Sequence, residues 1–349
     1  MDHAQAQSQN VFDLLVVGAG PAGLMAAEQA ARAGMRVAIA EAMPSPARKF
    51  LMAGKSGLNL TKAEEPNNFL QHFDIIAPLK PILAQFGPAE VIGFAQGLGQ
   101  EVFTGSTGRV FPTRMKASPL LRAWLARLDA LGVVLLRRHR WIGPLTTDAP
   151  HLLATPKGQV AVTAGALILA LGGASWARLG SDGAWQTPVA AAGVPIVPIQ
   201  ASNVGLQRAW SDHMRPFSGQ PVKNIELTVA DQQSRGEFVI TQSGVEGGAI
   251  YALGRMLRQT PLARIDLAPQ LSIHALRDMI SNRKPKDSLS NFLRKSVKLD
   301  ATKRALLFEL TRPMPRDTDG LIASIKAAPL QVWGPRPIDE AISTAGGLS

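Results

Sequence analysis

The sequence contains no cysteine, which excludes a disulfide framework, a thiolate metal site and a cysteine nucleophile. Aromatic residues make up only 5% of the chain and include a single tyrosine, so extensive base stacking on aromatic side chains is not expected. The longest apolar run, AGALILALGGA at 164–174, is too short and too rich in glycine to cross a membrane. The polar first ten residues do not resemble a signal peptide, and we expect a cytoplasmic protein.

Negative charge is also in short supply. The chain has 37 Lys and Arg against 26 Asp and Glu, for a net charge of +11. Residues 255–304 alone contain twelve of the basic residues and only four acidic ones. Such a stretch indicates a polyanionic partner, with RNA or the ribosome as candidates. The alternative is an ordinary solvated helical face, because arginines recur elsewhere in the chain.

The pattern of apolar residues predicts an α/β organisation. A strand is expected over 11–17 and another over 35–41, with an alanine-rich helix between them that ends at Gly34. Farther along, the pattern predicts helices over 78–97 and 118–132, and strands over 133–143 and 166–173, the last of them fully buried. Prolines around 194–200 indicate a domain boundary, and the chain becomes helical and basic from about 269 to 312.

The loop GAGPAG at 18–23 carries the strongest chemical signal. Gly18 permits a tight turn, Gly20 lets the backbone approach a pyrophosphate, and Gly23 allows close packing of helix on strand. The helix N-terminus then offers free N–H groups to the phosphates. Glu41 ends the second strand and is placed to accept hydrogen bonds from ribose hydroxyls, which favours FAD or NAD over NADP. The cofactor-binding prediction for this region also includes Ala19, Pro21, Ala22 and Ala42.

The stretch EAMPSPARKFLMAGKSGLNLTK at 41–62 follows the second strand directly, so it leaves the sheet edge where a dinucleotide would cross. Lys49 or Lys55 is a candidate for the flavin N1–O2 edge, where positive charge would stabilise the reduced ring. The residues predicted to line the ribityl chain or the flavin ring are Gly54, Ser56, Gly57, Asn59 and Thr61. The alternative is a solvated loop.

A second close approach to the dinucleotide is predicted at the end of ALILALGG. Ala170, Gly172 and Gly173 would place backbone rather than side chains at the sheet edge. Glycine also ends ordinary strands, which is the alternative.

Six separated motifs together resemble the HI0933-like (YhiN-type) flavoproteins, also labelled aminoacetone oxidase family FAD-binding enzymes. They are GAGPAGLMAAEQAARAG, EAMPSPARKFLMAGKSGLNLT, GRVFPTRMKASPLLRAWL, ALGGASWARLGSDGAW, GEFVITQSGVEGGAIYALG and AISTAGG. The resemblance covers nearly the whole chain, and within the family it points to the subgroup with RKFLMAG and GLNLT.

The resemblance implies a Rossmann-like FAD/NAD(P)-binding domain with an inserted small β-barrel plus helical subdomain. The FAD domain would cover 1–194, and 341–349 would begin the return to it. The insert would cover 195–340, with a barrel of 195–265 and 318–340 and a helical part of 266–317. The resemblance also implies tightly held FAD, with its adenosine end on Gly18–Gly23 and Glu41 and its flavin near 54–61.

The chain departs from the family pattern in two places. Lys55–Asn59 reads KSGLN where the main branch has Gly-Gly-Arg-Cys-Asn, so roles of that arginine and cysteine do not transfer. The chain also stops at Ser349, whereas members usually continue through a segment that completes the flavin site. We therefore expect a C-terminally truncated member, either a fragment or a form that has lost flavin binding.

The predicted function is that of an FAD-dependent oxidoreductase, with hydride transfer through flavin N5. The resemblance leaves three substrate classes open: amines, conjugated double bonds of steroid type, and uridine in ribosomal RNA, which the basic insert favours. NAD(P)H is a candidate electron donor. Two alternatives remain, a cofactor-free flavoprotein scaffold that binds RNA or the ribosome and a plain NAD-dependent dehydrogenase.

No residue is marked as a general acid or base by its sequence context. The candidates for a catalytic role are Lys55, Asn59 and Arg109. His139, His213 and His274 are each isolated in the sequence, which is more typical of structural or surface histidines. No metal site is predicted.

Overall fold

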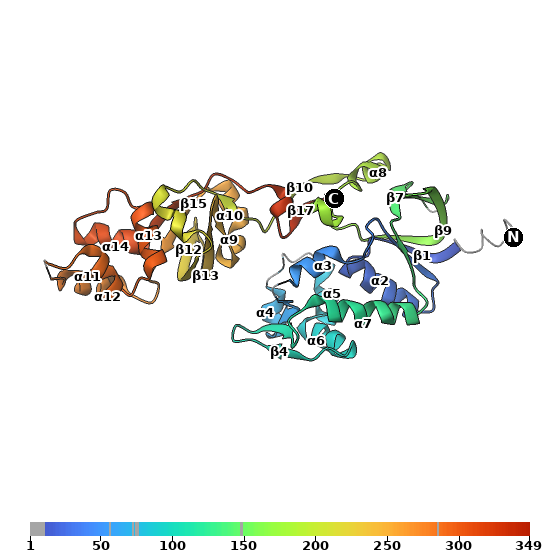
Figure 1. Cartoon of the computed structure of the whole chain (residues 1–349), viewed down its shortest axis with the longest axis horizontal. Helices are drawn as coiled ribbons and strands as arrows, with labels where there is room; N and C mark the ends of the chain where they lie inside the picture. Colours follow the sequence, from blue (N-terminus) through green and yellow to red (C-terminus); the bar gives the residue numbers. More distant parts are fainter. Residues whose placement is uncertain (1–10, 56, 72, 74–76, 147–148, 285) are drawn as a thin grey trace. The chain divides into compact units, whose positions relative to one another are not determined.

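The computed structural model describes residues 11–55, 57–71, 73, 77–146, 149–284 and 286–349. They form two compact units (Figure 1). The first unit comprises the chain up to Gly172 together with Ala177–Ile196, and the second comprises Gly173–Trp176 with Val197–Ser349. Among the described residues, no helix combines the length and the apolar composition needed to cross a membrane.

The first unit is built on a six-stranded sheet in the order β6-β2-β1-β9-β8-β7. Its strands are β1 (Val11–Val17), β2 (Val37–Glu41), β6 (Val134–Arg137), β7 (Arg140–Gly143), β8 (His151–Thr155) and β9 (Gly158–Leu169). The four strands β6, β2, β1 and β9 are parallel, whereas β7, β8 and β9 form an antiparallel meander. The predicted strand over 11–17 is confirmed.

Each face of this sheet is covered by different elements. Leu14 and Val16 of β1 pack with helices α2 and α7, whereas Leu15 and Val17 belong to a second core that includes Trp141 of the meander. The period of two along β1 therefore separates two buried layers. The helices are α2 (Pro21–Arg32), α3 (Arg48–Ala53), α4 (Pro66–Leu70), α5 (Leu79–Gln85), α6 (Pro88–Gly97), α7 (Ala117–Ala130), α8 (Gln186–Ala191) and the 3-10 helix η1 (Ala177–Leu179). A small sheet contains β3 (Thr61–Lys62), β4 (Val102–Thr104) and β5 (Arg109–Pro112).

Some predicted elements are divided in the structure. The helix expected over 78–97 is interrupted between α5 and α6, where Gly87 is extended and Pro88 begins the new helix. Proline disfavours a helical conformation in the residue before it, which explains the break. The strand expected over 133–143 is two strands, because Arg138 has a φ of 58° between β6 and β7.

The strand predicted at 166–173 is the second half of β9. Its first half pairs with β8, and its second half pairs in parallel with β1. The prediction of full burial was wrong, since Ile168 keeps 39% of its surface exposed. Apolar composition alone does not distinguish a strand covered on both faces from one that is covered on one face.

The second unit contains a sheet in the order β11-β14-β13-β12-β15-β16. Gln207 beside one edge exchanges backbone hydrogen bonds with Trp333 and Gly334, which follow the strand at the other edge. The sheet thus closes into a small barrel. Its strands are β11 (Leu206–Gln207), β12 (Pro221–Val229), β13 (Gln232–Thr241), β14 (Gly244–Glu246), β15 (Leu262–Asp266) and β16 (Ala328–Gln331), and β10 (Ile196–Ala201) pairs separately with β17 (Thr344–Leu348).

Helices complete the second unit and share one core with the barrel. They are α9 (Gly248–Ala252), α10 (Gly254–Gln259), α11 (Ile273–Ser281), α12 (Leu289–Lys295), α13 (Ala301–Leu310) and α14 (Thr318–Lys326), with the 3-10 helices η2 (Asp212–Phe217) and η3 (Ile338–Glu340). Figure 1 shows α11–α14 gathered at one end of this unit, beyond the barrel strands. Residues 318–326, which the sequence assigned to the barrel part of the insert, form α14, which begins at a side-chain cap from Asp317.

The predicted fold class is confirmed: a Rossmann-like α/β part accompanies a small β-barrel and a helical subdomain. The residue limits that the sequence suggested for the domains remain predictions.

Candidate dinucleotide-binding site

The loop between β1 and α2 uses its three glycines in different ways. Gly18 has a φ of 105°, and a Cβ there would lie 2.3 Å from the carbonyl oxygen of Ala170. A Cβ on Gly23 would lie 1.9 Å from the carbonyl oxygen of Gly18. At Gly20, by contrast, an added Cβ would meet no described atom within 4 Å. Gly18 and Gly23 are therefore required for packing, whereas Gly20 leaves open space beside the backbone.

This open space lies at the N-terminus of α2. Gly20 is the N-cap, no side chain caps the helix, and Pro21 occupies its first turn. The first turn contains no acidic residue. Unsatisfied N–H groups and the positive end of the helix dipole thus remain available to an anion, as a pyrophosphate site requires.

Glu41 is fixed beside the same loop. One carboxylate oxygen accepts a hydrogen bond from the backbone N–H of Ala19 at 2.9 Å, and the other accepts from Met43 at 2.8 Å. The carboxylate still has acceptor capacity, because each oxygen carries a further lone pair. Its position at the end of β2 suits contact with ribose hydroxyls. Ala42 follows it and is half-buried.

Helix α3 begins in contact with the glycine loop. Ala47, with a φ of 55°, donates its backbone N–H to the carbonyl of Ala19 at 2.9 Å. At the other end of α3, Gly54 packs on α7 so closely that a Cβ would lie 2.5 Å from the Cβ of Ala117. The segment after Glu41 therefore runs from the dinucleotide loop to the N-terminus of α7.

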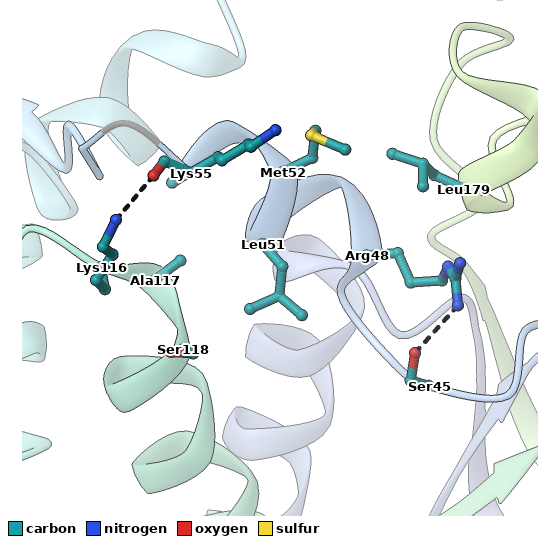
Figure 2. A pocket seen from close by; sticks show the side chains of 10 residues that line it. Ser45, Arg48, Leu51, Met52, Lys55, Lys116, Ala117, Ser118 and Leu179 are labelled. Carbon is teal, nitrogen blue, oxygen red and sulfur yellow. Dashed lines mark hydrogen bonds between the residues drawn. The ribbon is translucent and has the colours of Figure 1, made fainter.

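A cavity of about 470 Å³ lies along α3. Figure 2 shows its lining side chains on both sides of the helix, with Arg48 and Leu179 on one side and Lys116 on the other. The lining residues are Ser45, Arg48, Leu51, Met52, Gly54, Lys55, Lys116, Ala117, Ser118 and Leu179. Three cations around a partly apolar cavity suit a ligand that combines an anionic group with an apolar ring.

Arg48 is the most informative side chain in this lining. Its Nη1 donates weakly to the hydroxyl of Ser45 at 3.4 Å, and its buried Nε has no hydrogen-bond partner within the described chain. A buried donor of this kind is costly unless a ligand or water accepts from it. Lys116 donates to the carbonyl of Lys55 at 3.0 Å and stands at the uncapped N-terminus of α7. The sequence did not single out Arg48 or Lys116.

The two lysines proposed for the flavin edge differ in position. Lys55 lines the cavity and is exposed. Lys49 is half-buried on α3, is absent from the cavity lining, and has a pKa lowered by its burial. Lys55 is therefore the better placed of the two for a ligand in the cavity.

The remaining residues of the 54–61 segment lie on the side of the small sheet. A Cβ on Gly57 would lie 2.7 Å from the Cε of Met115, Asn59 is exposed, and Thr61 pairs with Val110. Ser56 lies outside the described residues. Their contact with a cofactor stays a prediction.

Three other candidates are not gathered around the cavity. Arg109 is exposed on β5 opposite Lys62, so it belongs to the small sheet. Gly172 is in the first unit, where an added Cβ would lie 3.5 Å from the hydroxyl of Ser181. Gly173 is grouped with the second unit, where a Cβ would lie 2.0 Å from the hydroxyl of Thr344. Neighbours in sequence thus have different structural surroundings.

The residues present fit a bound dinucleotide. The open space at Gly20, the uncapped N-terminus of α2 and the oriented Glu41 suit the pyrophosphate and ribose of a dinucleotide, and the buried Nε of Arg48, which has no partner within the described chain, offers a further contact. The fold and this site define a Rossmann-type dinucleotide-binding protein.

Comparison with known proteins places the chain in a particular family. The family model described as the HI0933-like protein Rossmann domain matches residues 12–349, and the chain belongs to this family. The membership supports assignment as a flavoprotein oxidoreductase with FAD as cofactor.

The chain is also similar to two curated proteins named ribosomal RNA dihydrouridine synthase. It is 24% identical to the protein of Escherichia coli (strain K12) over 288 residues, which cover 81% of this chain and 70% of the relative. It is 23% identical to the protein of Haemophilus influenzae over 286 residues, which cover 80% and 70%. A solved flavocytochrome c3 fumarate reductase is similar at 14% identity and a TM-score of 0.44, over all of this chain and 69% of that one, a level that carries no functional argument.

Proposed function

We propose that this protein is an FAD-dependent oxidoreductase that reduces a conjugated carbon–carbon double bond, with uridine in ribosomal RNA as the candidate substrate. The observation that carries the cofactor part is the arrangement of Gly20, open at the N-terminus of α2, beside the carboxylate of Glu41. NAD(P)H is the proposed electron donor.

In this proposal, the chain's own residues bind and orient the cofactor. The N–H groups that begin α2 would hold the pyrophosphate, and Glu41 would accept from the ribose hydroxyls. Arg48 would donate its orphaned Nε to a phosphate or to a ring acceptor. Lys55 would add positive charge at the cavity. Bound FAD supplies the hydride-transfer chemistry, which these side chains do not have themselves.

The substrate part of the proposal is supported by charge and by the relatives. Uridine becomes dihydrouridine when a hydride and a proton add across its conjugated double bond, and that is the product in the names of two relatives. The excess of basic residues in 255–304 favours a polyanionic substrate such as RNA. Uridine within RNA combines both features.

The first test is the visible absorption spectrum of the purified chain, followed by heat release and quantification of the flavin. We expect flavin bands and close to one FAD per chain. The flavin-loaded protein is then mixed with NADH or NADPH and with ribosomal RNA, and dihydrouridine is measured by mass spectrometry of the digested nucleosides. A folded, colourless protein that ignores added FAD would contradict the oxidoreductase proposal. Flavin without dihydrouridine would contradict only the proposed substrate.

Replacing Arg48 with methionine is expected to weaken FAD binding by about tenfold or more, since a charge-assisted hydrogen bond contributes about 1.5–3 kcal/mol. Methionine keeps the apolar stem of the side chain, so packing along α3 changes little. Titration of the apoprotein with FAD measures the effect. Arg122, exposed on α7, provides the matched control in Arg122→Met. Equal FAD affinity in both variants would show that Arg48 does not contact FAD.

A further inference from the structure

The basic residues of 255–304 are not equivalent once the second unit is folded. Five of them use their side chains to hold the unit together. Lys303 is buried and donates to the carbonyls of Asn224 and Leu267, at 2.9 and 2.7 Å. The other internal contacts are Arg258 to the Ser202 carbonyl, Arg277 to Asp319, Arg283 to the Asp287 carbonyl and Arg304 to the Leu299 carbonyl. These side chains stabilise the fold and are less available to a partner.

A different set of cations remains at the surface. We define the 284–298 surface by its five exposed cations, Lys284, Lys286, Arg294, Lys295 and Lys298. None of them has a side-chain hydrogen bond or an ion pair within the described part of the chain. Asp287 is the acidic residue within this stretch, and it is only half-exposed. The surface thus carries a strong and local excess of positive charge.

Helix α12 carries two of these cations and separates the other three. Helix α12 begins at a cap from the hydroxyl of Ser288 and buries Phe292 and Leu293 in the core. Arg294 and Lys295 lie in its last turn and therefore project from the exposed side. Before α12, the guanidinium of Arg283 donates a hydrogen bond to the Asp287 carbonyl at 2.8 Å and lies 5.9 Å from the centre of the Phe292 ring, which ties Arg283 to the start of the helix.

The spacing of the cations suits a polyphosphate backbone. Lys284 and Lys286 precede α12, and Arg294, Lys295 and Lys298 come at or after its end. A helix of this length rises about 10 Å, so the two groups of cations are separated by a distance similar to that between phosphates a few nucleotides apart. Extended Lys and Arg side chains from both groups can therefore contact different phosphates of the same strand.

The side chains beside and between the cations indicate which polyanion fits. The exposed neighbours carry hydroxyl or amide groups, namely Ser281, Asn282, Ser288, Ser290, Asn291 and Ser296. Such groups donate to phosphate and sugar oxygens. Among the described residues of this surface, Phe292, Leu293 and Val297 are buried in the core and Leu289 is half-buried, so none of these apolar side chains is fully exposed for insertion into a lipid layer. These features favour RNA over a membrane surface.

We propose that the 284–298 surface is the RNA-docking surface of this protein, and that it holds RNA through phosphate and sugar contacts rather than through base stacking. This inference rests on the proposed function in one respect, because that function supplies RNA as the substrate. It narrows a basic stretch of 255–304 to five neighbouring side chains and separates them from the five basic residues with internal contacts. Arg255 and Arg264 are also exposed but lie outside this surface.

The test compares RNA binding by two double variants, Arg294→Gln with Lys295→Gln, and Lys284→Gln with Lys286→Gln. A matched control removes the same charge from the first unit through Arg122→Gln with Lys157→Gln. The probe is a fluorescent RNA hairpin of ribosomal sequence, and affinity is read by anisotropy at several salt concentrations. Each docking-surface variant is expected to bind about tenfold or more weakly at about 0.1 M salt, with a salt slope lower by about 1.5, whereas the control stays near wild type.

The outcomes separate this inference from the proposed function. Weaker RNA binding by either docking-surface variant but not by the control, with unchanged flavin content and melting temperature, supports the proposal that the 284–298 surface docks RNA. Wild-type binding in both docking-surface variants, or an equal loss in the control, overturns it. The flavin spectrum and the dihydrouridine assay judge the proposed function independently. The two double variants affect a helix end and a loop respectively, so one folding defect does not remove both tests.

Discussion

Replacing Gly20 with valine is expected to abolish stable FAD binding while the protein still folds. Gly20 has a φ of −77° and a ψ of 176°, a conformation that any residue adopts, and its Cβ position is open. The substitution should therefore lower the free energy of unfolding by no more than about 1 kcal/mol, the usual size of the effect when an N-cap residue is replaced. The pyrophosphate needs the same open space, and a branched side chain would hold it off the α2 N-terminus. Affinity for FAD should fall by about a hundredfold or more, equivalent to about 2.7 kcal/mol.

The measurement is the flavin content of purified Gly20→Val, together with titration of FAD into the apoprotein. Gly93→Val is the matched control, because a Cβ at Gly93 in α6 also meets no described atom within 4 Å. Circular dichroism and urea unfolding establish that both variants fold. Gly18 and Gly23 are unsuitable for this test, since a Cβ at either position would collide with backbone. Wild-type flavin content in Gly20→Val would show that the pyrophosphate does not pass this glycine.

The parts of the site that the sequence predicted are those where local pattern and chemistry coincide. The β1–loop–α2–β2 order fixes where Gly18, Gly20 and Gly23 must lie, because the strands and helix that flank them are strongly apolar. Glu41 follows from the same unit, since a residue at the end of β2 reaches the loop after β1. Neither inference needs information about distant parts of the chain.

The cavity could not be predicted in the same way, because it depends on packing between segments that are distant in sequence. Arg48 and Lys116 line one cavity because α3 packs closely on α7, where Gly54 meets Ala117. Gly172 and Gly173 appeared as one glycine pair, yet they are assigned to different compact units.

The charge pattern gave a similarly incomplete view of 255–304. A count of Lys and Arg does not distinguish Lys303, which is buried and bonded to two carbonyls, from Lys298, which is exposed. Burial lowers the pKa of Lys303, an effect that follows from tertiary packing alone. Surface charge must therefore be assigned after the core is known.

Glu28 is another residue whose importance appears only in the structure. In the alanine-rich helix α2 it resembles an ordinary exposed glutamate, but it is only 2% exposed. Its carboxylate accepts from the indole N–H of Trp124 at 2.7 Å, from Arg127 at 3.1 Å and from Arg32 at 2.8 Å. Arg127 also donates to the carbonyl of Gly97 at the end of α6. Glu28 thus joins α2, the helix of the candidate dinucleotide-binding site, to α7 and, through Arg127, to α6.

Glu28→Gln is expected to destabilise the first unit by about 3 kcal/mol, within the range for breaking a buried ion pair. Glutamine keeps the volume, but its amide brings an N–H donor to a site where the Trp124 and arginine donors already converge. Urea unfolding followed by tryptophan fluorescence measures the change, and Glu101→Gln, at an exposed position, is the control. For a urea dependence of about 2 kcal/mol per molar, the midpoint should fall by about 1.5 M. An unchanged midpoint would show that the buried carboxylate does not stabilise the unit.

The pH dependence of stability provides a second, independent test of the role of Glu28. Burial is the largest influence and raises the pKa of Glu28, but hydrogen bonds from Arg32, Arg127 and Trp124, with the charge of Arg127, bring the pKa below its ordinary value of 4.5. A carboxyl whose pKa is lower in the folded state stabilises the protein above its unfolded pKa and loses that contribution as pH falls through the folded pKa. The difference in free energy of unfolding between wild type and Glu28→Gln should therefore have its largest value at neutral pH and decrease below pH 4.5. A difference that stayed constant into acid would mean that the loss reflects packing alone, because packing does not titrate.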